Sequence, residues 1–227
     1  MKIENNVLKH YLKNVYFITG TAYAGKSTTV KMLAERYGML LCGENYHMNV
    51  SERVATPQTH PDLCYNRQLT DWREFVKRTP EEYERWIYAV GREAAEFEVA
   101  ELIAVSQHQK VIVDTNIPLD ILSEISDYHH VAVMLSPQSM SVERFFDRSD
   151  PEKQFLLNVI DSCEDPAAVM ENYRQGLARI NSQEHYQEYA NSGFFTVVRE
   201  DNGVDTREAV CETIARHFGL LDEKGKS

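Results

Sequence analysis

The stretch GTAYAGKSTT, residues 20–29, decides the fold because it places two glycines, a lysine and several hydroxyl side chains in one short segment. It follows the apolar run VYFIT (15–19), which predicts a strand covered on both faces, and it precedes a helix predicted over 26–37. Glycine allows backbone torsions and close approaches that a side chain would block. Successive amide groups can then point into one concavity beside the positive end of the helix. The stretch therefore predicts an anion-binding loop between a strand and a helix.

This loop fits the P-loop or Walker A pattern, G-x-x-x-x-G-K-[ST]. In that pattern Lys26 reaches the β- and γ-phosphates of a bound ATP, the hydroxyl of Ser27 ligates Mg²⁺, and Thr28 hydrogen-bonds an α-phosphate. The predicted nucleotide-binding residues of the loop are Gly20, Thr21, Ala22, Tyr23, Ala24, Gly25, Lys26, Ser27 and Thr28.

The rest of the chain alternates between strand and helix patterns, which predicts an α/β fold with a mainly parallel sheet. Residues 44–78 show a weaker pattern, typical of a loop with one or two short helices. Thr79, Pro80 and Glu82 form a capping-box signature at the start of a long helix. We expect one three-layer α/β/α domain over residues 1–227 with a five-stranded parallel sheet. The further strands are predicted at 39–42, 111–115, 131–135 and 194–198. Further helices are predicted at 80–107, 118–126, 138–148 and 206–218, and a helical region at about 166–190.

The composition of the chain argues against long nucleic acids and membranes as partners. The net charge of −11 repels the phosphate backbone of DNA or RNA, so a long nucleic-acid partner is not expected. The sequence contains no apolar run of about 18 residues, which argues against a membrane span, and its first residues lack the apolar core of a secretory signal. We expect a cytoplasmic protein with a small-molecule partner, and no pattern indicates an oligomeric state. Four well-separated cysteines are predicted to be buried free thiols: Cys42, Cys64, Cys163 and Cys211.

In its Walker A loop and its order of elements, the sequence resembles the P-loop small-molecule kinases, the group that includes nucleoside monophosphate, shikimate, gluconate and chloramphenicol kinases. The resemblance implies transfer of the γ-phosphoryl group of Mg·ATP to a small acceptor, either an alcohol or a phosphate. It also implies a helical insertion over the acceptor at 44–107 and a lid at about 144–160. Tyr23 departs from the pattern, because these kinases commonly carry another glycine in the middle of the loop. Its side chain can contact the nucleotide or the second substrate.

Two carboxylates are candidates for the chemistry. Asp114 ends the predicted third strand, where a Walker B carboxylate would hold Mg²⁺ together with Ser27; the alternative is an aspartate that caps the next turn. Glu44 follows the second strand, and the resemblance implies that it accepts or orients the proton of an acceptor hydroxyl. An equally good interpretation of Glu44 is a surface glutamate in a loop. His47 is a weaker candidate for the same role, since a lone histidine in a polar loop is usually solvated.

Three arginines are candidates for contacts with the nucleotide. Arg144 and Arg148 are four residues apart on one predicted helical face in the lid segment, and Arg148 is the better catalytic candidate. A lid arginine would neutralise charge on the transferring phosphoryl group, although both side chains can instead pair with neighbouring acidic residues. Arg199 follows the last strand, where the related kinases bind adenine, and is a possible stacking group.

The basic residues in the insertion do not identify the acceptor, because they have two interpretations. They can bind a phosphate or carboxylate on the acceptor, or they are surface charges balanced by nearby acidic residues. Two other functions therefore remain possible: a nucleotide kinase in the strict sense, whose substrate phosphate they would clamp, and a nucleotide-binding ATPase or regulatory switch without a small acceptor. The arginines concerned are Arg53, Arg67, Arg73, Arg85 and Arg92.

Overall fold

The computed structural model describes residues 3–143, 145–146, 151–200 and 203–221. In these residues five strands form one sheet, in the order β2-β3-β1-β4-β5, and every neighbouring pair is parallel. The prediction of a five-stranded parallel sheet is therefore confirmed. The strands are β1 (Val15–Gly20), β2 (Leu40–Cys42), β3 (Val111–Asp114), β4 (Val131–Leu135) and β5 (Phe195–Val198).

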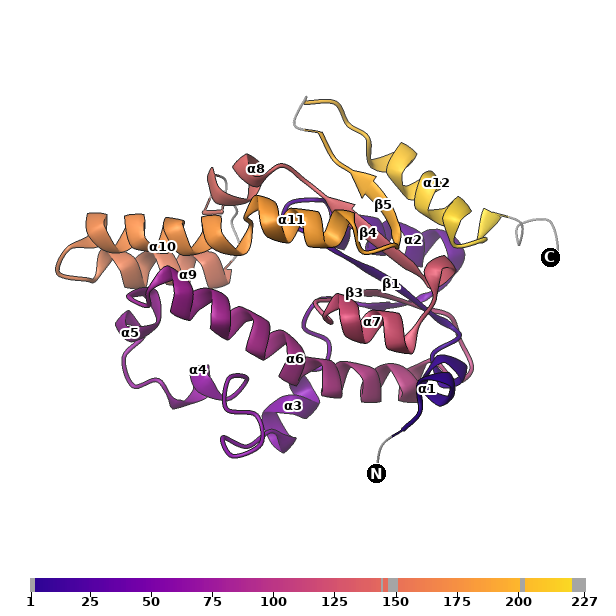
Figure 1. Ribbon diagram of the computed structural model, residues 1–227, viewed down its shortest axis with the longest axis horizontal. Coiled ribbons are helices and arrows are strands. Elements are labelled where there is room, and N and C mark those ends of the chain that lie inside the picture. Colours follow the sequence, from indigo (N-terminus) through magenta and orange to yellow (C-terminus); the bar gives the residue numbers. More distant parts are fainter. Residues whose placement is uncertain (1–2, 144, 147–150, 201–202, 222–227) are drawn as a thin grey trace.

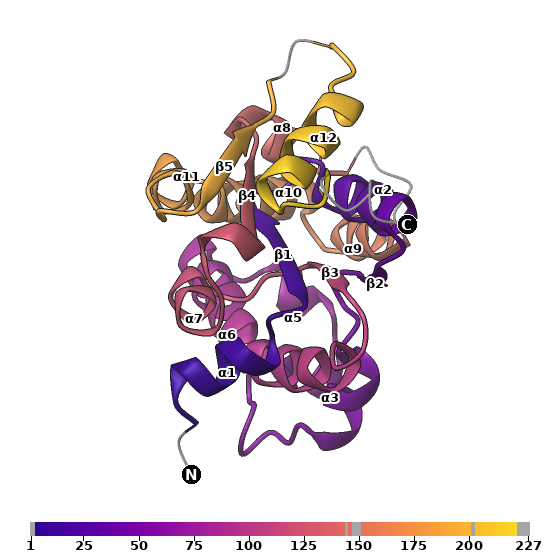
Figure 2. The same ribbon diagram turned by 90° about the vertical axis from the view of Figure 1, so that its right-hand side faces the viewer.

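Helices cover both faces of this sheet (Figures 1 and 2). Most of them lie in the crossovers between strands, as a parallel sheet requires. They are α1 (Asn5–Tyr11), α2 (Lys26–Tyr37), α3 (Met48–Val54), α4 (Tyr65–Gln68), α5 (Arg73–Val76), α6 (Pro80–Val105), α7 (Leu119–Ile125), the 3₁₀ helix η1 (Tyr128–His130), α8 (Gln138–Glu143), α9 (Pro151–Asp161), α10 (Pro166–Ile180), α11 (Gln183–Ala190) and α12 (Arg207–His217).

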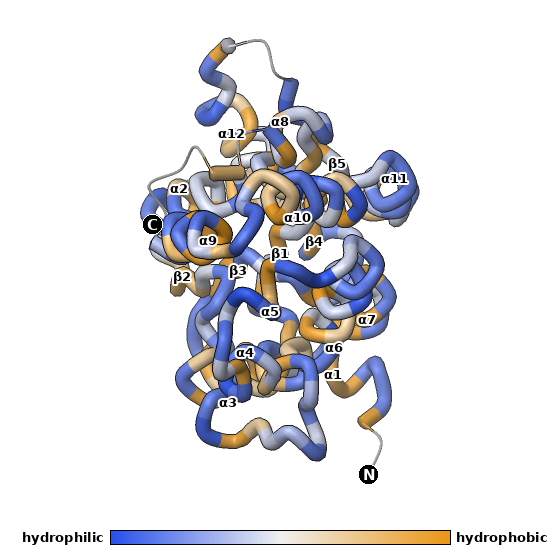
Figure 3. The backbone as a smooth tube through the Cα atoms, turned by 90° about the vertical axis from the view of Figure 1, so that its left-hand side faces the viewer, coloured by the Kyte–Doolittle hydropathy of each residue, from blue (hydrophilic) through white to orange (hydrophobic). Residues whose placement is uncertain are grey.

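The alternation of side chains along β1 explains why both faces are covered. Tyr16 and Ile18 point to one face and pack with residues of α2 and α12. Val15 and Phe17 point to the other face and pack with residues of α6 and α7. All six residues of β1 are buried, so the strand has no solvent-exposed face. Hydrophobic residues accordingly follow β1 through the middle of the molecule, while the surrounding helices are of mixed hydropathy (Figure 3). This arrangement is compatible with a three-layer α/β/α fold.

A further hydrophobic cluster lies beyond the carboxyl ends of the strands (Figure 1). It joins α5, α6, α9 and α10 through buried residues such as Phe75, Tyr83, Ile160 and Tyr173. The capping box at the start of α6 is confirmed, because the Thr79 hydroxyl accepts a bond from the amide of Glu82 and the Glu82 carboxylate accepts one from the amide of Thr79. The helical insertion is thus packed against α9 and α10 rather than extended into solvent.

Several predicted helix boundaries were wrong. Helix α1 was not predicted, and the 44–78 segment holds three short helices rather than one or two. The helical region predicted over 166–190 is confirmed and holds two helices, α10 and α11; the Ser182 hydroxyl caps α11 by accepting a bond from the amide of His185. Within the predicted lid, the part at 151–160 belongs to the regular helix α9, and the remaining residues of the lid are described only in part.

The order of the strands places a switch point at β1 and β4. The crossover from β1 leads through α2 to β2 on one side of the sheet, whereas the crossover from β4 leads to β5 on the other side. Between two such strands the connections diverge and leave a crevice outside their carboxyl ends, where α/β proteins bind ligands. The 20–27 loop follows β1 directly, so it begins at this crevice.

The turn out of β1 depends on Gly20. Its φ of 128° lies outside the range that side chains favour, and a Cβ atom there would come 1.9 Å from the carbonyl oxygen of Met134. The next residue, Thr21, donates its amide hydrogen to that same carbonyl at 3.0 Å. The loop can therefore leave β1 beside β4 only because residue 20 lacks a side chain.

We expect Gly20→Ala to destabilise the protein by more than about 3 kcal/mol or to prevent folding, because a rigid backbone carbonyl must move. Gly38→Ala is the matched control: Gly38 also has a positive φ, of 62°, but a Cβ atom added there would meet no atom within 4 Å. It should cost only about 1 kcal/mol. Urea unfolding followed by circular dichroism measures both, and equal costs would contradict the steric account.

Candidate active site

The 20–27 loop encloses the side chain of Lys26. The Lys26 ammonium donates hydrogen bonds to the carbonyl oxygens of Gly20 and Thr21, each at 3.0 Å. Gly25, with φ of 95°, is the N-cap of α2 and has no side chain that could bond the free amides of the first helical turn. The loop thus combines a lysine, free helix amides and a glycine-permitted backbone at the start of α2.

Tyr23 takes an unusual backbone conformation in the middle of this loop. Its φ is 65°, the left-handed region, and among the described residues it is the one non-glycine residue with a positive φ. The Tyr23 carbonyl accepts a hydrogen bond from the guanidinium of Arg199 at 2.8 Å, and the ammonium of Lys153 on α9 lies 5.8 Å from the Tyr23 ring centroid. The loop is therefore connected both to the segment after β5 and to α9. Stacking of Arg199 on adenine stays a prediction.

Ser136, directly after β4, ties the loop to the sheet. Its amide donates to the Thr21 hydroxyl at 2.8 Å, and its own hydroxyl donates to the carbonyl oxygen of Ala22 at 2.5 Å. Ser136 was not among the predicted site residues, although a polar residue immediately after a buried strand at the ligand-binding edge is a usable signal.

Asp114, at the end of β3, lies next to the loop. The Ser27 hydroxyl donates to Asp114 Oδ2 at 2.7 Å, so the two predicted metal-binding residues are brought together. The Asp114 side chain is buried, and its other oxygen, Oδ1, has no hydrogen-bond partner among the described residues. Burial raises the pKa of Asp114, while nearby Lys26 lowers it. A buried carboxylate oxygen without a partner is costly unless a ligand or cation reaches it.

The two residues after Asp114 each bond a different carboxyl group. The Thr115 hydroxyl donates to Glu98 Oε2 on α6 at 2.7 Å, and the Asn116 amide donates to Glu44 Oε1, after β2, at 2.8 Å. Side chains from the end of β3 therefore bond the start of α2, the loop after β2 and the middle of α6. This convergence brings predicted Glu44 to the same edge as Asp114.

Glu98 is a buried carboxyl group that was not predicted from the sequence. Its side chain is 1% exposed, and burial raises its pKa to about 8, with smaller upward effects from Glu44 and Asp114. It occupies the buried face of α6 together with Ala94 and Leu102, and their four-residue spacing is the signal that could have identified it.

His47 is not solvated, contrary to the prediction. It is buried, and its Nδ1 lies 3.3 Å from the Ser51 hydroxyl on α3. Burial lowers the pKa of His47. Glu44, by contrast, is exposed and bonded to Asn116. Of the two candidates for a proton acceptor, Glu44 is therefore the one the structure connects to the end of β3.

Most arginines of the insertion are engaged within their own segment. Arg73 pairs with Asp71 at 2.7 Å, and Arg92 pairs with Asp120 on α7 at 2.7 Å. Arg67 donates to the carbonyl oxygens of Glu52 and Ala55, Arg53 donates to that of Asn49, and Arg85 is exposed on α6. The predicted lid residues Arg144 and Arg148 lie outside the described residues.

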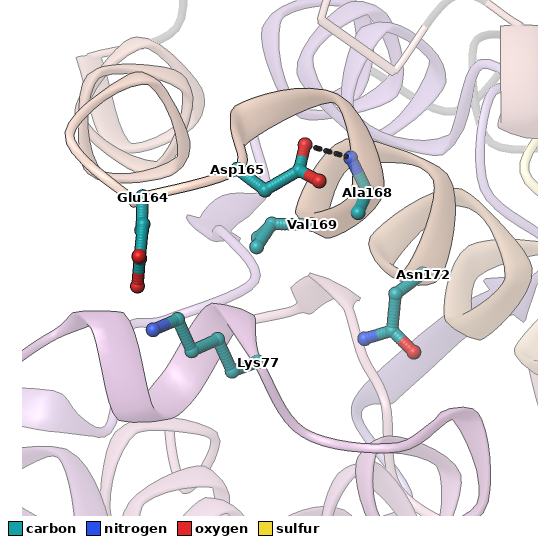
Figure 4. A pocket seen from close by; sticks show the side chains of 6 residues that line it. All are labelled: Lys77, Glu164, Asp165, Ala168, Val169 and Asn172. Carbon is teal, nitrogen blue, oxygen red and sulfur yellow. Dashed lines mark hydrogen bonds between the residues drawn. The ribbon is translucent and has the colours of Figure 1, made fainter.

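A surface hollow of about 610 Å³ lies between the end of α5 and the start of α10 (Figure 4). None of the predicted site residues lines it. Asp165 in it already serves as the N-cap of α10 by accepting a bond from the amide of Ala168. The candidate site is therefore located by topology and hydrogen bonding, not by this hollow. The lining residues are Lys77, Glu164, Asp165, Ala168, Val169 and Asn172.

Comparison with protein-family models and with curated proteins gave no match to this chain. No helix in the described ranges is long and apolar enough to cross a membrane. In the same part of the chain, no group of three or more histidine, cysteine, aspartate or glutamate side chains is placed to hold a metal ion. All four cysteines are free and buried, as predicted.

Glu98→Gln should flatten the dependence of stability on pH. Because burial raises the pKa of Glu98 to about 8, its protonated form stabilises the fold fully below the ordinary glutamate pKa of about 4.5, and this contribution is lost as the pH rises to 8. The amide variant can still accept the Thr115 bond and has no proton to lose. We expect the variant to gain up to about 3 kcal/mol relative to wild type between pH 5 and pH 8.

Urea unfolding at pH 5, 6.5 and 8 measures this difference. Glu101→Gln, on the same helix, controls for the loss of a carboxylate from α6. Parallel stability curves for wild type and Glu98→Gln would show that Glu98 does not hold a proton in the folded protein.

Proposed function

We propose that the protein is an ATP-dependent phosphotransferase of the P-loop kinase type, which moves the γ-phosphoryl group of Mg·ATP to a small acceptor. The observation that carries the proposal is the 2.7 Å hydrogen bond between Ser27 and Asp114. It joins a loop of Walker A sequence to a strand-end carboxylate at the crevice where the crossovers of the sheet diverge. A glycine-rich turn without function would not require this pairing.

The 20–27 loop is the proposed phosphate site. Its amides and the amino end of α2 favour anionic oxygens. Lys26 donates hydrogen bonds to the carbonyl oxygens of Gly20 and Thr21. Charged phosphate oxygens form stronger hydrogen bonds with an ammonium group than neutral carbonyls do, so a bound triphosphate would replace these carbonyls as acceptors. Binding would thus draw the ammonium onto the β- and γ-phosphates.

The residues present fit a magnesium ion. Asp114 has a buried oxygen without a partner and lies beside the Ser27 hydroxyl. Magnesium typically takes one or two protein oxygens and completes its shell with phosphate oxygens and water, which agrees with the lack of a larger ligand group in the described residues. Bound there by Ser27 and Asp114, it would neutralise charge on the phosphates.

The acceptor is proposed to lie on the side of Asp114 that faces Glu44. Asn116 holds one oxygen of the Glu44 carboxylate at 2.8 Å, which leaves the other oxygen available to accept a proton from a hydroxyl. Neutralisation of the transferring group by Arg144 or Arg148 remains part of the proposal.

The alternative is a nucleotide-binding ATPase or regulatory switch without a small acceptor. The contacts of Tyr23 favour this alternative, since Arg199 and Lys153 both approach this residue of the phosphate loop. Nucleotide binding at the loop would then displace the segment after β5 and helix α9. The two functions differ in one measurement. ADP release that requires an added acceptor supports the kinase, whereas equal release with water alone supports the switch.

We expect Lys26→Ala to weaken ATP binding by about tenfold to a hundredfold, because a charge-assisted contact to the phosphates is lost. Lys31→Ala, on the exposed side of the same helix, should bind ATP as wild type does. Isothermal titration calorimetry measures both affinities. Unchanged affinity in Lys26→Ala would exclude the loop as the phosphate site.

Asp114→Asn tests the metal. Wild type should bind ATP more tightly with excess Mg²⁺ than with a chelator present, and the variant should lose most of that difference because its neutral amide is a poor ligand for Mg²⁺. Asp120→Asn, which removes an exposed carboxylate after the same strand, should keep the difference. If Asp114→Asn keeps it as well, the ion is bound elsewhere.

A further inference from the structure

Two side chains from outside the 20–27 loop hold the carbonyl groups in its middle. The hydroxyl of Ser136 donates to the carbonyl oxygen of Ala22 at 2.5 Å, and the guanidinium of Arg199 donates to that of Tyr23 at 2.8 Å. Lys26 holds the two carbonyls before these, but a bound triphosphate would draw it away. The middle of an occupied loop would therefore depend on Ser136 and Arg199.

The sheet fixes the positions of these two residues. Ser136 is the first residue after β4, and Arg199 is the first residue after β5. The strands are paired with Leu135 opposite Val198, and the Arg199 amide donates to the carbonyl oxygen of Leu135 at 2.7 Å. Both side chains therefore approach the loop from the carboxyl ends of two neighbouring strands.

The bond from Arg199 sets the direction of an amide as well as that of a carbonyl. In a trans peptide group the C=O and N–H bonds point in opposite directions, and the described ranges contain no cis peptide bond. Because the Tyr23 carbonyl is turned toward Arg199, the amide of Ala24 is turned away from it. Ala24 is 2% exposed, and its amide has no hydrogen-bond acceptor among the described residues. A buried donor of this kind is costly until a ligand supplies an oxygen.

This orientation requires a strained backbone at Tyr23. Its φ of 65° lies in the left-handed region, which glycine adopts freely and other residues adopt only at a cost. Gly25, two residues further on, also has a positive φ, of 95°. Left-handed residues at such positions turn neighbouring amides into one concavity that binds anions. A charge-assisted bond to the Tyr23 carbonyl offsets the cost of the strain.

We propose that Arg199 is a positioning residue for the phosphates of the nucleotide. It holds Tyr23 in the left-handed conformation and thereby directs the amide of Ala24 to the phosphate oxygens. This inference rests on the proposed phosphate site, and it assigns Arg199 to that site through the backbone of the loop, in place of stacking on adenine. It also accounts for a tyrosine at a position where the resembling kinases commonly carry glycine, because a bond from outside the loop stabilises the conformation that glycine would adopt unaided.

Inorganic tripolyphosphate separates the two roles of Arg199, because it carries phosphates without a base. Isothermal titration calorimetry of the full chain with excess Mg²⁺ would measure its affinity and that of ATP. We expect Arg199→Ala to weaken both ligands by a similar factor, about three- to tenfold, as for the loss of one hydrogen bond. A loss confined to ATP would assign Arg199 to adenine and overturn the proposal. Arg216→Ala is the control: it removes an exposed arginine that pairs with Glu212 on α12, and both affinities should stay within about twofold.

Substitutions of Tyr23 test whether Arg199 acts through the backbone. In Tyr23→Gly the left-handed conformation is not strained, so adding Arg199→Ala should change the affinity for tripolyphosphate by no more than about twofold. In Tyr23→Ala the ring is removed but the strain remains, so adding Arg199→Ala should weaken binding as much as it does in the wild type. An equal loss in all three backgrounds would show that Arg199 acts independently of this backbone conformation, which overturns the proposal.

Two further measurements separate positioning from a merely structural role. Arg199 is exposed, so Arg199→Ala should unfold at the same urea concentration as the wild type. Arg199→Lys should recover part of the lost affinity, because its ammonium can donate to the same carbonyl. A lower urea midpoint together with no recovery in Arg199→Lys would assign Arg199 a structural role.

The wild type itself distinguishes this inference from the proposed function. Failure to bind Mg·ATP would remove the proposed function. Binding of Mg·ATP without measurable binding of tripolyphosphate would leave a nucleotide site but overturn the role of the loop amides and of Arg199 as their positioning residue.

Discussion

The structure depends on a close approach of two backbones, at Gly20 and Met134. β1 and β4 lie side by side, and the chain must leave β1 within contact distance of a carbonyl of its neighbour. Because residue 20 has no Cβ atom, the Thr21 amide reaches that carbonyl. Ser136 then bonds Thr21 and Ala22, and α2 begins at Lys26. The position of the loop at the switch point of the sheet, and hence every contact proposed for a nucleotide, follows from this steric requirement.

The fold was largely predictable because its main elements carry local signals. The buried strands are continuous apolar runs, α2 ends at a left-handed glycine, and α6 begins with a capping box. The failures have a common cause. In α1, α3 and α4 few side chains are buried, so the helical periodicity in the sequence is weak and packing decides whether these helices form. Within the correctly predicted helical region 166–190, the break between α10 and α11 depends on a single serine cap, which the helical pattern on either side conceals.

The candidate site was predictable where residues adjoin a strand end. The 20–27 loop, Asp114 and Glu44 all lie at or shortly after the end of a strand, and parallel strands bring their carboxyl ends to one edge. Glu98 was missed because it comes from the middle of a long helix, and its sequence position says nothing about which strand that helix crosses. The pairing of Thr115 with Glu98, and of Asn116 with Glu44, requires the three-dimensional register of β2, β3 and α6. The arginines of the insertion could not be assigned from the sequence. They cluster between residues 53 and 92, but this clustering does not show which groups they bond, and most of them bond groups in their own segment.

The length of α6 has a mechanical consequence. Its 26 residues form one uninterrupted helix about 39 Å long. In its carboxyl half, Glu98 bonds Thr115 after β3. Near its amino end, Tyr83 packs in the cluster with α9 and α10. One continuous helix therefore joins the outer cluster, through Tyr83, to the strand that carries Asp114, through Glu98 and Thr115.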